Sequence, residues 1–205
     1  MYYKRDKSVE SWLLFMLGLV ALMIVVGGAT RLTNSGLSIT EWAPIRGALP
    51  PLSIESWQSE FDKYQLIPEF EAEHPGMGRE GFKRIYYWEW GHRQLGRFIG
   101  LAYTIPLFFF LFRGRLPRGH RWKFFGIAIL IGIQGAIGWW MVHSGLQEGM
   151  VNVSQYRLAA HLGTAFFILG LLFWTWRDQK EGWGPKMRAS IFTGMSTLIA
   201  GLVYL

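Results

Sequence analysis

Two of the five histidines in this 205-residue sequence, His92 and His161, have a placement that suits chemistry inside a membrane. Each lies just inside the same end of a long apolar segment, so we expect the two imidazoles at one depth. Ionisable side chains are costly at membrane depth and usually mark a functional site. Because imidazole nitrogen is a common axial ligand of haem iron, the pair predicts a haem held between two helices. Interfacial histidines hydrated by water are the alternative that placement leaves open.

Residues on the same helix face as His92 extend this prediction. Glu89 precedes His92 by three residues. Gly96 and Gly100 follow at four-residue steps, so all four residues lie near one face. Glycines beneath an axial histidine let a flat macrocycle approach the backbone, although the same spacing also suits a close helix–helix contact. The Glu89 carboxylate could orient the imidazole, relay protons or stabilise developing positive charge, and an ion pair with Arg93 is its structural alternative.

Arginines near the two histidines are expected to bind the carboxylates of such a haem. Arg31, Arg93 and Arg157 all lie at the histidine end of their apolar segments. A guanidinium binds a carboxylate through two parallel hydrogen bonds, so these three predict contacts to haem propionates. Arg97 lies one turn deeper than Arg93 and requires a partner or a route to the interface. For each arginine, anchoring in the lipid headgroups is the alternative.

Four further polar residues inside or between the apolar segments are weaker candidates. Gln134 lies within an apolar segment, where its amide requires a hydrogen-bond partner. His143 ends that segment and could act as a third ligand or proton relay, but hydration at the interface is favoured. His74 and His120 lie in loops, where we expect both to be solvated.

The elements that must position these residues are apolar segments long enough to cross a bilayer of about 30 Å. The chain is 51% hydrophobic and contains four such stretches. The sequence therefore predicts an all-α membrane protein, a bundle of four transmembrane helices followed by the start of a fifth. The expected helices are residues 11–30, 94–112, 124–142 and 158–176, with the fifth beginning at 189–205.

The basic residues set the expected orientation of these helices. The net charge is +7, but the lysines and arginines cluster beside the spanning segments, so we expect membrane topology rather than nucleic-acid binding to explain it. The basic tail 1–10 and the basic loops 113–123 and 177–188 are predicted to face the cytoplasm. The loops 31–93 and 147–155 then lie outside. The absence of cysteine excludes disulfides, thiolate metal sites and covalent c-type haem.

The first loop, 31–93, is far longer than an ordinary connection, which is typical of a functional or partly ordered segment. The pattern from Ile54 to Leu66 predicts a short amphipathic helix, with Ser53 as its N-cap. The sequence ends at Leu205 within an apolar stretch, and we expect it to be the first part of a longer protein.

Four strings in this order, GGATRLTNSGLSITEW, YWEWGHRQLGRFIGLAY, QGAIGWWMVHSGL and VSQYRLAAHLGTA, resemble the amino-terminal half of the haem A synthase family. The resemblance implies an eight-helix enzyme made of two pseudo-symmetric four-helix bundles. The family motif E-x-x-H-R corresponds to Glu89, His92 and Arg93, and the histidine of R-L-A-x-H-L corresponds to His161. The chain is similar to the cysteine-free subgroup.

The resemblance also implies a reaction, in which a methyl group of haem O is converted into a formyl group by successive hydroxylations. The first bundle would hold haem O between His92 and His161, with Glu89 in the catalytic role. A haem b that delivers electrons would lie in the second bundle. Expected partners are the lipid bilayer, the assembly of cytochrome oxidase and haem O synthase, in a bacterial inner membrane. Self-association is left open.

Two other functions remain compatible with the spacing of the histidines. The chain could be a four-helix b-type cytochrome, in which His92 and His161 bind a permanent haem that only transfers electrons. It could instead be a haem-binding assembly subunit without catalysis, if the protein ends at Leu205. Two more helix-borne histidines encoded downstream would favour the synthase.

Overall fold

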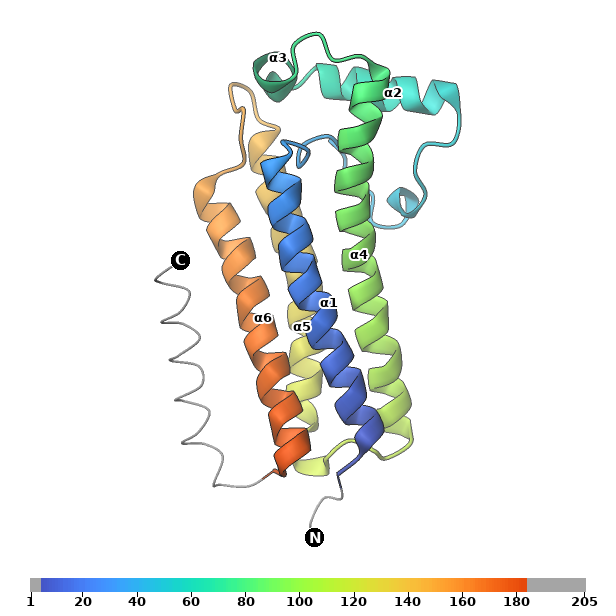
Figure 1. Ribbon diagram of the computed structural model, residues 1–205, viewed down its shortest axis with the longest axis vertical. Coiled ribbons are helices and arrows are strands. Elements are labelled where there is room, and N and C mark those ends of the chain that lie inside the picture. The colour runs from blue at the N-terminus through green and yellow to red at the C-terminus, as the bar shows by residue number, and fades with distance from the viewer. Residues whose placement is uncertain (1–4, 184–205) are drawn as a thin grey trace.

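The computed structural model describes residues 5–183, and within them the chain is built of helices without a strand. Four long helices form an elongated bundle, and two shorter ones lie at one end of it (Figure 1). The predicted start of a fifth helix at 189–205 lies outside the described residues. The helices are α1 (Lys7–Leu32), α2 (Ile54–Gln65), α3 (Pro68–Glu73), α4 (Arg79–Phe112), α5 (Arg121–Gly145) and α6 (Gln155–Glu181), with short 3₁₀ turns η1 (Arg46–Ala48) and η2 (Arg118–His120).

Four of these helices, α1, α4, α5 and α6, are long and apolar enough to cross a membrane. Large apolar side chains also cover the outside of the bundle, Val25 on α1 and Ile105 on α4 among them. A helix that is apolar on its outer face as well as its inner one suits a hydrocarbon solvent, because lipid tails replace water around it. The prediction of a helical protein with four membrane-spanning segments is confirmed.

The four spanning helices pack as a ring, in which α1 contacts α4 and α6, and α5 contacts the same two helices. Fully buried side chains from all four fill the centre. Tyr103 on α4 donates a hydrogen bond from its hydroxyl to the Phe124 carbonyl on α5, at 3.0 Å. Trp12 on α1 donates its indole N–H to the Ala102 carbonyl on α4, also at 3.0 Å. These two aromatic side chains thus join α4 to α5 and α1 to α4 through their polar groups.

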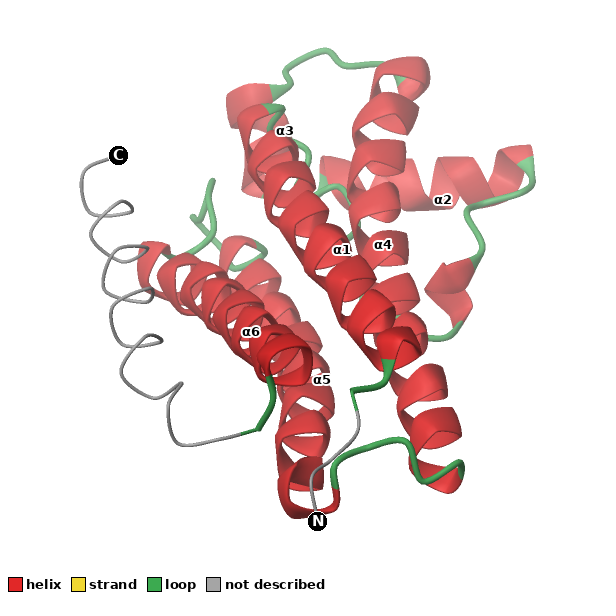
Figure 2. Cartoon of the chain, turned by 60° about the horizontal axis from the view of Figure 1, so that its bottom comes forward, coloured by secondary structure: helices red, strands yellow, loops and turns green. Residues whose placement is uncertain are grey.

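The connection between α1 and α4, residues 33–78, folds over one end of the bundle, and we call it the cap. Its helix α2 lies across the axis of α4 (Figures 1 and 2). The predicted amphipathic helix is confirmed as α2, and Ser53 is its N-cap in a capping box with Ser56. Trp57 and Phe61 on α2 pack against Phe82 on α4, so the apolar face of α2 is buried on the part of α4 that projects beyond the membrane-spanning stretch.

The prediction that α4 begins at residue 94 is wrong, since the helix starts at Arg79. The prediction followed the apolar stretch, whereas the helix continues through charged residues beyond it. Lys83 and Glu80, one turn apart, form an ion pair at 2.7 Å on this extension. Residues 79–93 are therefore helical, not part of a loop. The other spanning helices also exceed their predicted bounds, and α6 continues to Glu181, within the predicted loop 177–188.

The bundle end opposite the cap is held by a largely buried ion pair between α5 and α6. Lys123 Nζ lies 2.7 Å from Asp178 Oδ2, with side-chain exposures of 17% and 7%. The Lys123 ammonium also lies 4.5 Å from the centre of the Trp174 ring. These contacts fix the relative register of the two helices whose opposite ends form the candidate site.

Candidate functional site

The two predicted ligands, His92 and His161, lie on α4 and α6 with their rings against neighbouring helices. A Cβ added to Gly27 of α1 would lie 3.2 Å from His92 Nε2. A Cβ added to Gly138 of α5 would lie 2.9 Å from His161 Cε1. Both distances are tighter than ordinary van der Waals contact, so glycine is what leaves room for each imidazole. Both rings thus face partners inside the bundle rather than lipid.

His92 lies in the half of α4 nearer the cap and His161 in the first turns of α6, so both belong to the cap end of the bundle. His161 Nδ1 is buried and has no hydrogen-bond partner among the described residues. Burying an imidazole nitrogen without a hydrogen-bond partner is unfavourable. Metal-bound histidines almost always use both ring nitrogens, one for the metal and one for a hydrogen bond. His161 therefore has the spare hydrogen-bonding capacity that an axial ligand would use.

Gly27 and Gly138 were not singled out by the sequence, which pointed instead to Gly96 and Gly100. Gly96 faces α1, where its added Cβ would lie 3.3 Å from Met23 Cε, and a Cβ on Gly100 would meet nothing within 4 Å. Gly96 thus makes a close helix–helix contact, which was the alternative to a haem contact, and Gly100 borders open space. The partner of a helical glycine lies on another helix, so spacing along one helix does not reveal it.

Gln134 has the partner that its burial required, and that partner is at the site. Its Nε2 donates to the backbone carbonyl of His161 at 2.9 Å. Its Oε1 is buried and has no partner among the described residues. Gln134 and Gly138, one turn apart on α5, together hold the His161 segment of α6 against α5.

Glu89 lies on α4 one turn from His92 and is 2% exposed. Its Oε2 accepts hydrogen bonds from Ser38 Oγ at 2.8 Å and from the Ile39 backbone N–H at 2.7 Å. Its Oε1 accepts two from Arg93, through Nε at 3.1 Å and Nη2 at 2.6 Å. Four hydrogen bonds, two of them from the Arg93 guanidinium, join Glu89 on α4 to the cap.

Arg93 belongs to the same junction between the cap and α4. Besides Glu89, its Nη2 donates to the Ile39 carbonyl at 2.8 Å and its Nη1 to the Glu41 carbonyl at 3.2 Å. The guanidinium also lies 5.7 Å from the centre of the Trp139 ring on α5. The ion pair that was the alternative for Glu89 is therefore present in the structure, and Arg93 donors are directed to the cap.

The other two arginines expected near a haem differ in their surroundings. Arg157 Nη1 donates to the Trp140 carbonyl at 2.8 Å, and its guanidinium lies 4.6 Å from the centre of the Trp140 ring. Arg31 is exposed in the last turn of α1. Both lie at the cap end of the bundle, which is also the end that holds the two histidines.

The remaining histidines are less solvated than the sequence suggested, with one exception. His143 is exposed, as expected, and its contacts are with Gln147 one turn on and with the Trp139 ring one turn back. His74 is partly buried, with Nδ1 2.7 Å from the Tyr64 hydroxyl. His120 stacks on Trp183, with ring centres 4.4 Å apart. The expectation of solvated loops was wrong for these two because aromatic side chains from elsewhere in the chain reach them.

A second buried acid lies in the cap. Glu69 is 5% exposed, and the Tyr64 hydroxyl lies 3.4 Å from its Oε2. Burial, followed by repulsion from Glu89, raises the pKa of Glu69 to about 8. The same burial raises the pKa of the Tyr64 hydroxyl. The neutral form of Glu69 is therefore favoured at physiological pH.

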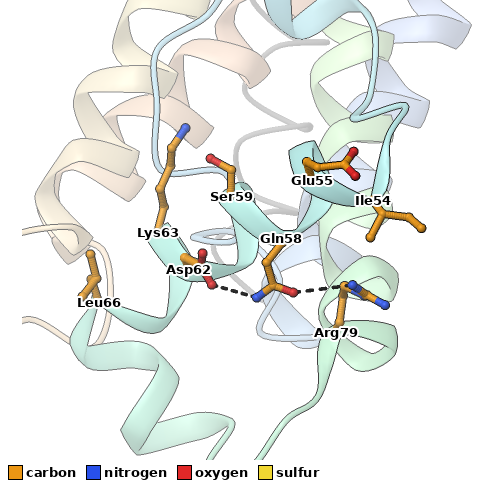
Figure 3. Close-up of a pocket in the computed structure, with 8 residues that line it drawn as sticks. All are labelled: Ile54, Glu55, Gln58, Ser59, Asp62, Lys63, Leu66 and Arg79. Atoms are coloured by element: carbon orange, nitrogen blue, oxygen red, sulfur yellow. Dashed lines mark hydrogen bonds between the residues drawn. The ribbon is translucent and has the colours of Figure 1, made fainter.

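A depression on the outer face of α2 contains none of the predicted site residues (Figure 3). Gln58 spans it, donating to Asp62 Oδ1 at 2.8 Å and accepting from Arg79 Nη1 at 3.5 Å. The depression is shallow, and it lies on the surface of the cap away from the two histidines. The remaining lining residues are Ile54, Glu55, Ser59, Lys63 and Leu66.

Comparison with known proteins identifies the family of the chain. A family described as cytochrome oxidase assembly protein (COX15-CtaA) matches residues 10–205. The chain belongs to this family. Its relatives include a protein named heme A synthase from Maricaulis maris, 50% identical over 98% of this chain and 58% of the relative. Another of that name, from Dinoroseobacter shibae, is 58% identical over 82% of this chain and 44% of the relative.

A third protein of the same name, from Beijerinckia indica, is 55% identical over 98% of this chain and 56% of its own length. The chain thus spans about half the length of the curated relatives it matches. No solved structure matches it. The matched region of the family contains α1, α4, α5 and α6, and with them both histidines and Glu89.

Proposed function

We propose that this chain carries the substrate site of a haem A synthase, which oxidises a methyl group of haem O to a formyl group by successive hydroxylations. The observation that carries the proposal is the packing of two imidazoles, His92 on α4 and His161 on α6, against glycines of neighbouring helices at the cap end of the bundle. Membership of the cytochrome oxidase assembly family and relatives named heme A synthase support it.

The residues present fit a haem substrate. His92 and His161 would be the axial ligands, and the unpartnered Nδ1 of His161 is free to donate once the other nitrogen binds iron. Gly27 and Gly138 give the two rings room to turn. When bound, the haem iron supplies the redox chemistry. Arg31 and Arg157 are at the right end of the bundle to receive propionates.

Of the three roles expected for Glu89, its hydrogen bonds favour the electrostatic one. Its two oxygens accept four hydrogen bonds, two of them from the Arg93 guanidinium, so no Glu89 oxygen is without a donor. We propose that the Glu89 carboxylate, one turn from His92, stabilises positive charge that develops during oxidation. It also holds the cap closed through Ser38, which limits access of water to the histidines.

The rest of the enzyme completes this proposal. A haem b that delivers electrons would be held in the second bundle, outside this chain, and haem O would arrive from haem O synthase. The basic segments at the end opposite the cap favour a cytoplasmic location for that end, with the cap on the outer side of a bacterial inner membrane. The product would serve the assembly of cytochrome oxidase. A permanent b-type haem or a non-catalytic subunit is less favoured, because the relatives are named as synthases.

The test is to express the complete protein with haem O and follow haem O and haem A by chromatography. Wild-type protein should accumulate haem A, and Glu89→Gln should retain bound haem O while making little haem A. Protein whose haem cycles its redox state without chemical change would establish the electron-transfer alternative. Glu55→Gln is the matched control, since Glu55 is exposed on α2.

A further inference from the structure

One stretch of the cap runs down the side of α4 instead of lying over the bundle end. This stretch, residues 43–54, contains η1 and is called the wedge here. Figures 1 and 2 show its short turn beside α4, below the level of α2 in Figure 1. Arg97 donates from Nε to the Pro44 carbonyl at 2.9 Å and from Nη2 to the Ala43 carbonyl at 3.1 Å. Gln94 Nε2 donates to the carbonyls of Gly47 and Ala48, at 3.0 and 3.2 Å.

The residues that hold the wedge lie within the membrane-spanning part of α4. Arg97 precedes Phe112, the last residue of α4, by fifteen residues, which is about 22 Å of helix at 1.5 Å per residue. Arg113 follows directly and begins the basic loop at the far interface. A hydrocarbon core of about 30 Å measured from there extends about 8 Å past Arg97 towards the cap. The wedge is therefore level with the outermost hydrocarbon on the cap side.

The backbone carbonyls of the wedge are suited to hydrocarbon surroundings. Every carbonyl from residue 43 to residue 48 accepts a hydrogen bond, from Gln94, from Arg97 or from the backbone N–H groups of η1 and its C-cap. Prolines at positions 44, 50 and 51 have no N–H to satisfy. Non-helical backbone is tolerated at membrane depth only where its polar groups have partners, and the wedge meets that condition for these carbonyls.

The side chains of the wedge are apolar and face outwards. Ile45 is 86% exposed and Leu52 81%, and Leu49 and Ile54 are 68% and 69% exposed. Arg46 is the one charged residue among positions 43–54. This apolar surface continues the exposed apolar face of α4, on which Phe98 and Leu101 are 50% and 59% exposed. A surface of this kind in contact with water would be unfavourable, whereas next to lipid it is continuous with the membrane-facing side of the bundle.

We propose that the wedge inserts into the leaflet on the cap side, with Ile45 at the boundary between headgroups and acyl chains. Arg97 is then an anchor that satisfies wedge carbonyls at membrane depth, in place of the lipid headgroup that a lone arginine would require. The bilayer is the occupant of this surface because the tethers fix its depth and its apolar face joins that of α4. The inference depends on α4 spanning the membrane and not on the identity of the bound haem.

The test is site-directed fluorescence in the complete protein, reconstituted into phosphatidylcholine vesicles. Residues 1–205 contain no cysteine, so after replacement of any cysteine elsewhere by serine, Ile45→Cys can carry a single environment-sensitive label. Leu66→Cys at the end of α2, 85% exposed, is the matched water-facing control, and Ile105→Cys on α4, 64% exposed, is the lipid-facing control. Quenching is measured with acyl-brominated lipid and with aqueous iodide.

The label at residue 45 should lose fluorescence to brominated lipid, most with bromine near the headgroup end of the chain, and be protected from iodide. Quenching by iodide to the level seen at residue 66 would overturn the proposal. Protection from both quenchers would also overturn it, since another part of the protein or a second copy would then cover the wedge. Arg97→Gln should make the label at residue 45 accessible to iodide, whereas Arg84→Gln, on the exposed extension of α4, should not.

Discussion

Adding one methyl group at residue 138 is expected to impair haem binding without unfolding the protein. In Gly138→Ala the new Cβ would lie 2.9 Å from His161 Cε1, closer than side chains approach each other. The atom in the way is at the far end of the imidazole, so the ring is the part that gives way. Overpacking of this kind costs about 1–3 kcal/mol. Because the strain is relieved by moving the imidazole of His161, we expect its cost in the free energy of haem binding rather than in the free energy of unfolding.

Since 1.4 kcal/mol is a factor of ten in an equilibrium constant, haem affinity should fall about 5- to 150-fold. Gly135→Ala, on the same helix, is the matched control because its Cβ would meet nothing within 4 Å. Gly27→Ala and Gly28→Ala form a second pair, with His92 Nε2 3.2 Å from the first Cβ and nothing within 4 Å of the second. Haem content and spectroscopic titration of purified protein measure the effect. Equal affinities within each pair would refute the assignment of the two glycines.

Three further predictions concern buried charges. In the wild-type protein the free energy of unfolding should fall as pH rises from about 4.5 to about 8, because the raised pKa of Glu69 lets the folded state bind one more proton than the unfolded state in that range. Glu69→Gln should remove this fall, which thermal unfolding at a series of pH values measures. A wild-type protein whose free energy of unfolding is the same across this pH range would contradict the prediction. Glu89→Gln should destabilise by about 3 kcal/mol, because Arg93 loses its buried partner, and an unchanged melting temperature would count against the junction. Lys123→Met should cost a similar amount, about 3 kcal/mol, by leaving Asp178 unpaired. Arg177→Met, in the more exposed pair with Glu181, should cost less than about 1 kcal/mol, and equal losses would refute the difference.

The elements of this fold could be predicted where their cause lies in neighbouring residues. Apolar runs give the four spanning helices, and Ser53 with the pattern from Ile54 onwards gives α2 and its cap. The start of α4 could not be read in this way. Residues 79–93 mix charges and aromatics, and their helix is stabilised by packing of α2 against Phe82.

The same distinction between local and non-local causes applies to the candidate site. His92, His161 and Glu89 were predictable because ionisable groups are rare in apolar segments. The positions that accommodate them, Gly27 and Gly138, depend on which helices become neighbours, and this information is not local. The partner of Arg97 was likewise hidden, since it consists of backbone carbonyls about fifty positions earlier in the chain.

The central claim, that His92 and His161 bind the same haem, is tested most directly by electron paramagnetic resonance of the ferric complete protein. With two axial imidazoles the substrate haem should give a low-spin signal. His92→Ala and His161→Ala should each convert that same signal to high spin, and added imidazole should restore it, while any haem in the other half keeps its own signal. A low-spin spectrum that survives unchanged in either variant would contradict the account.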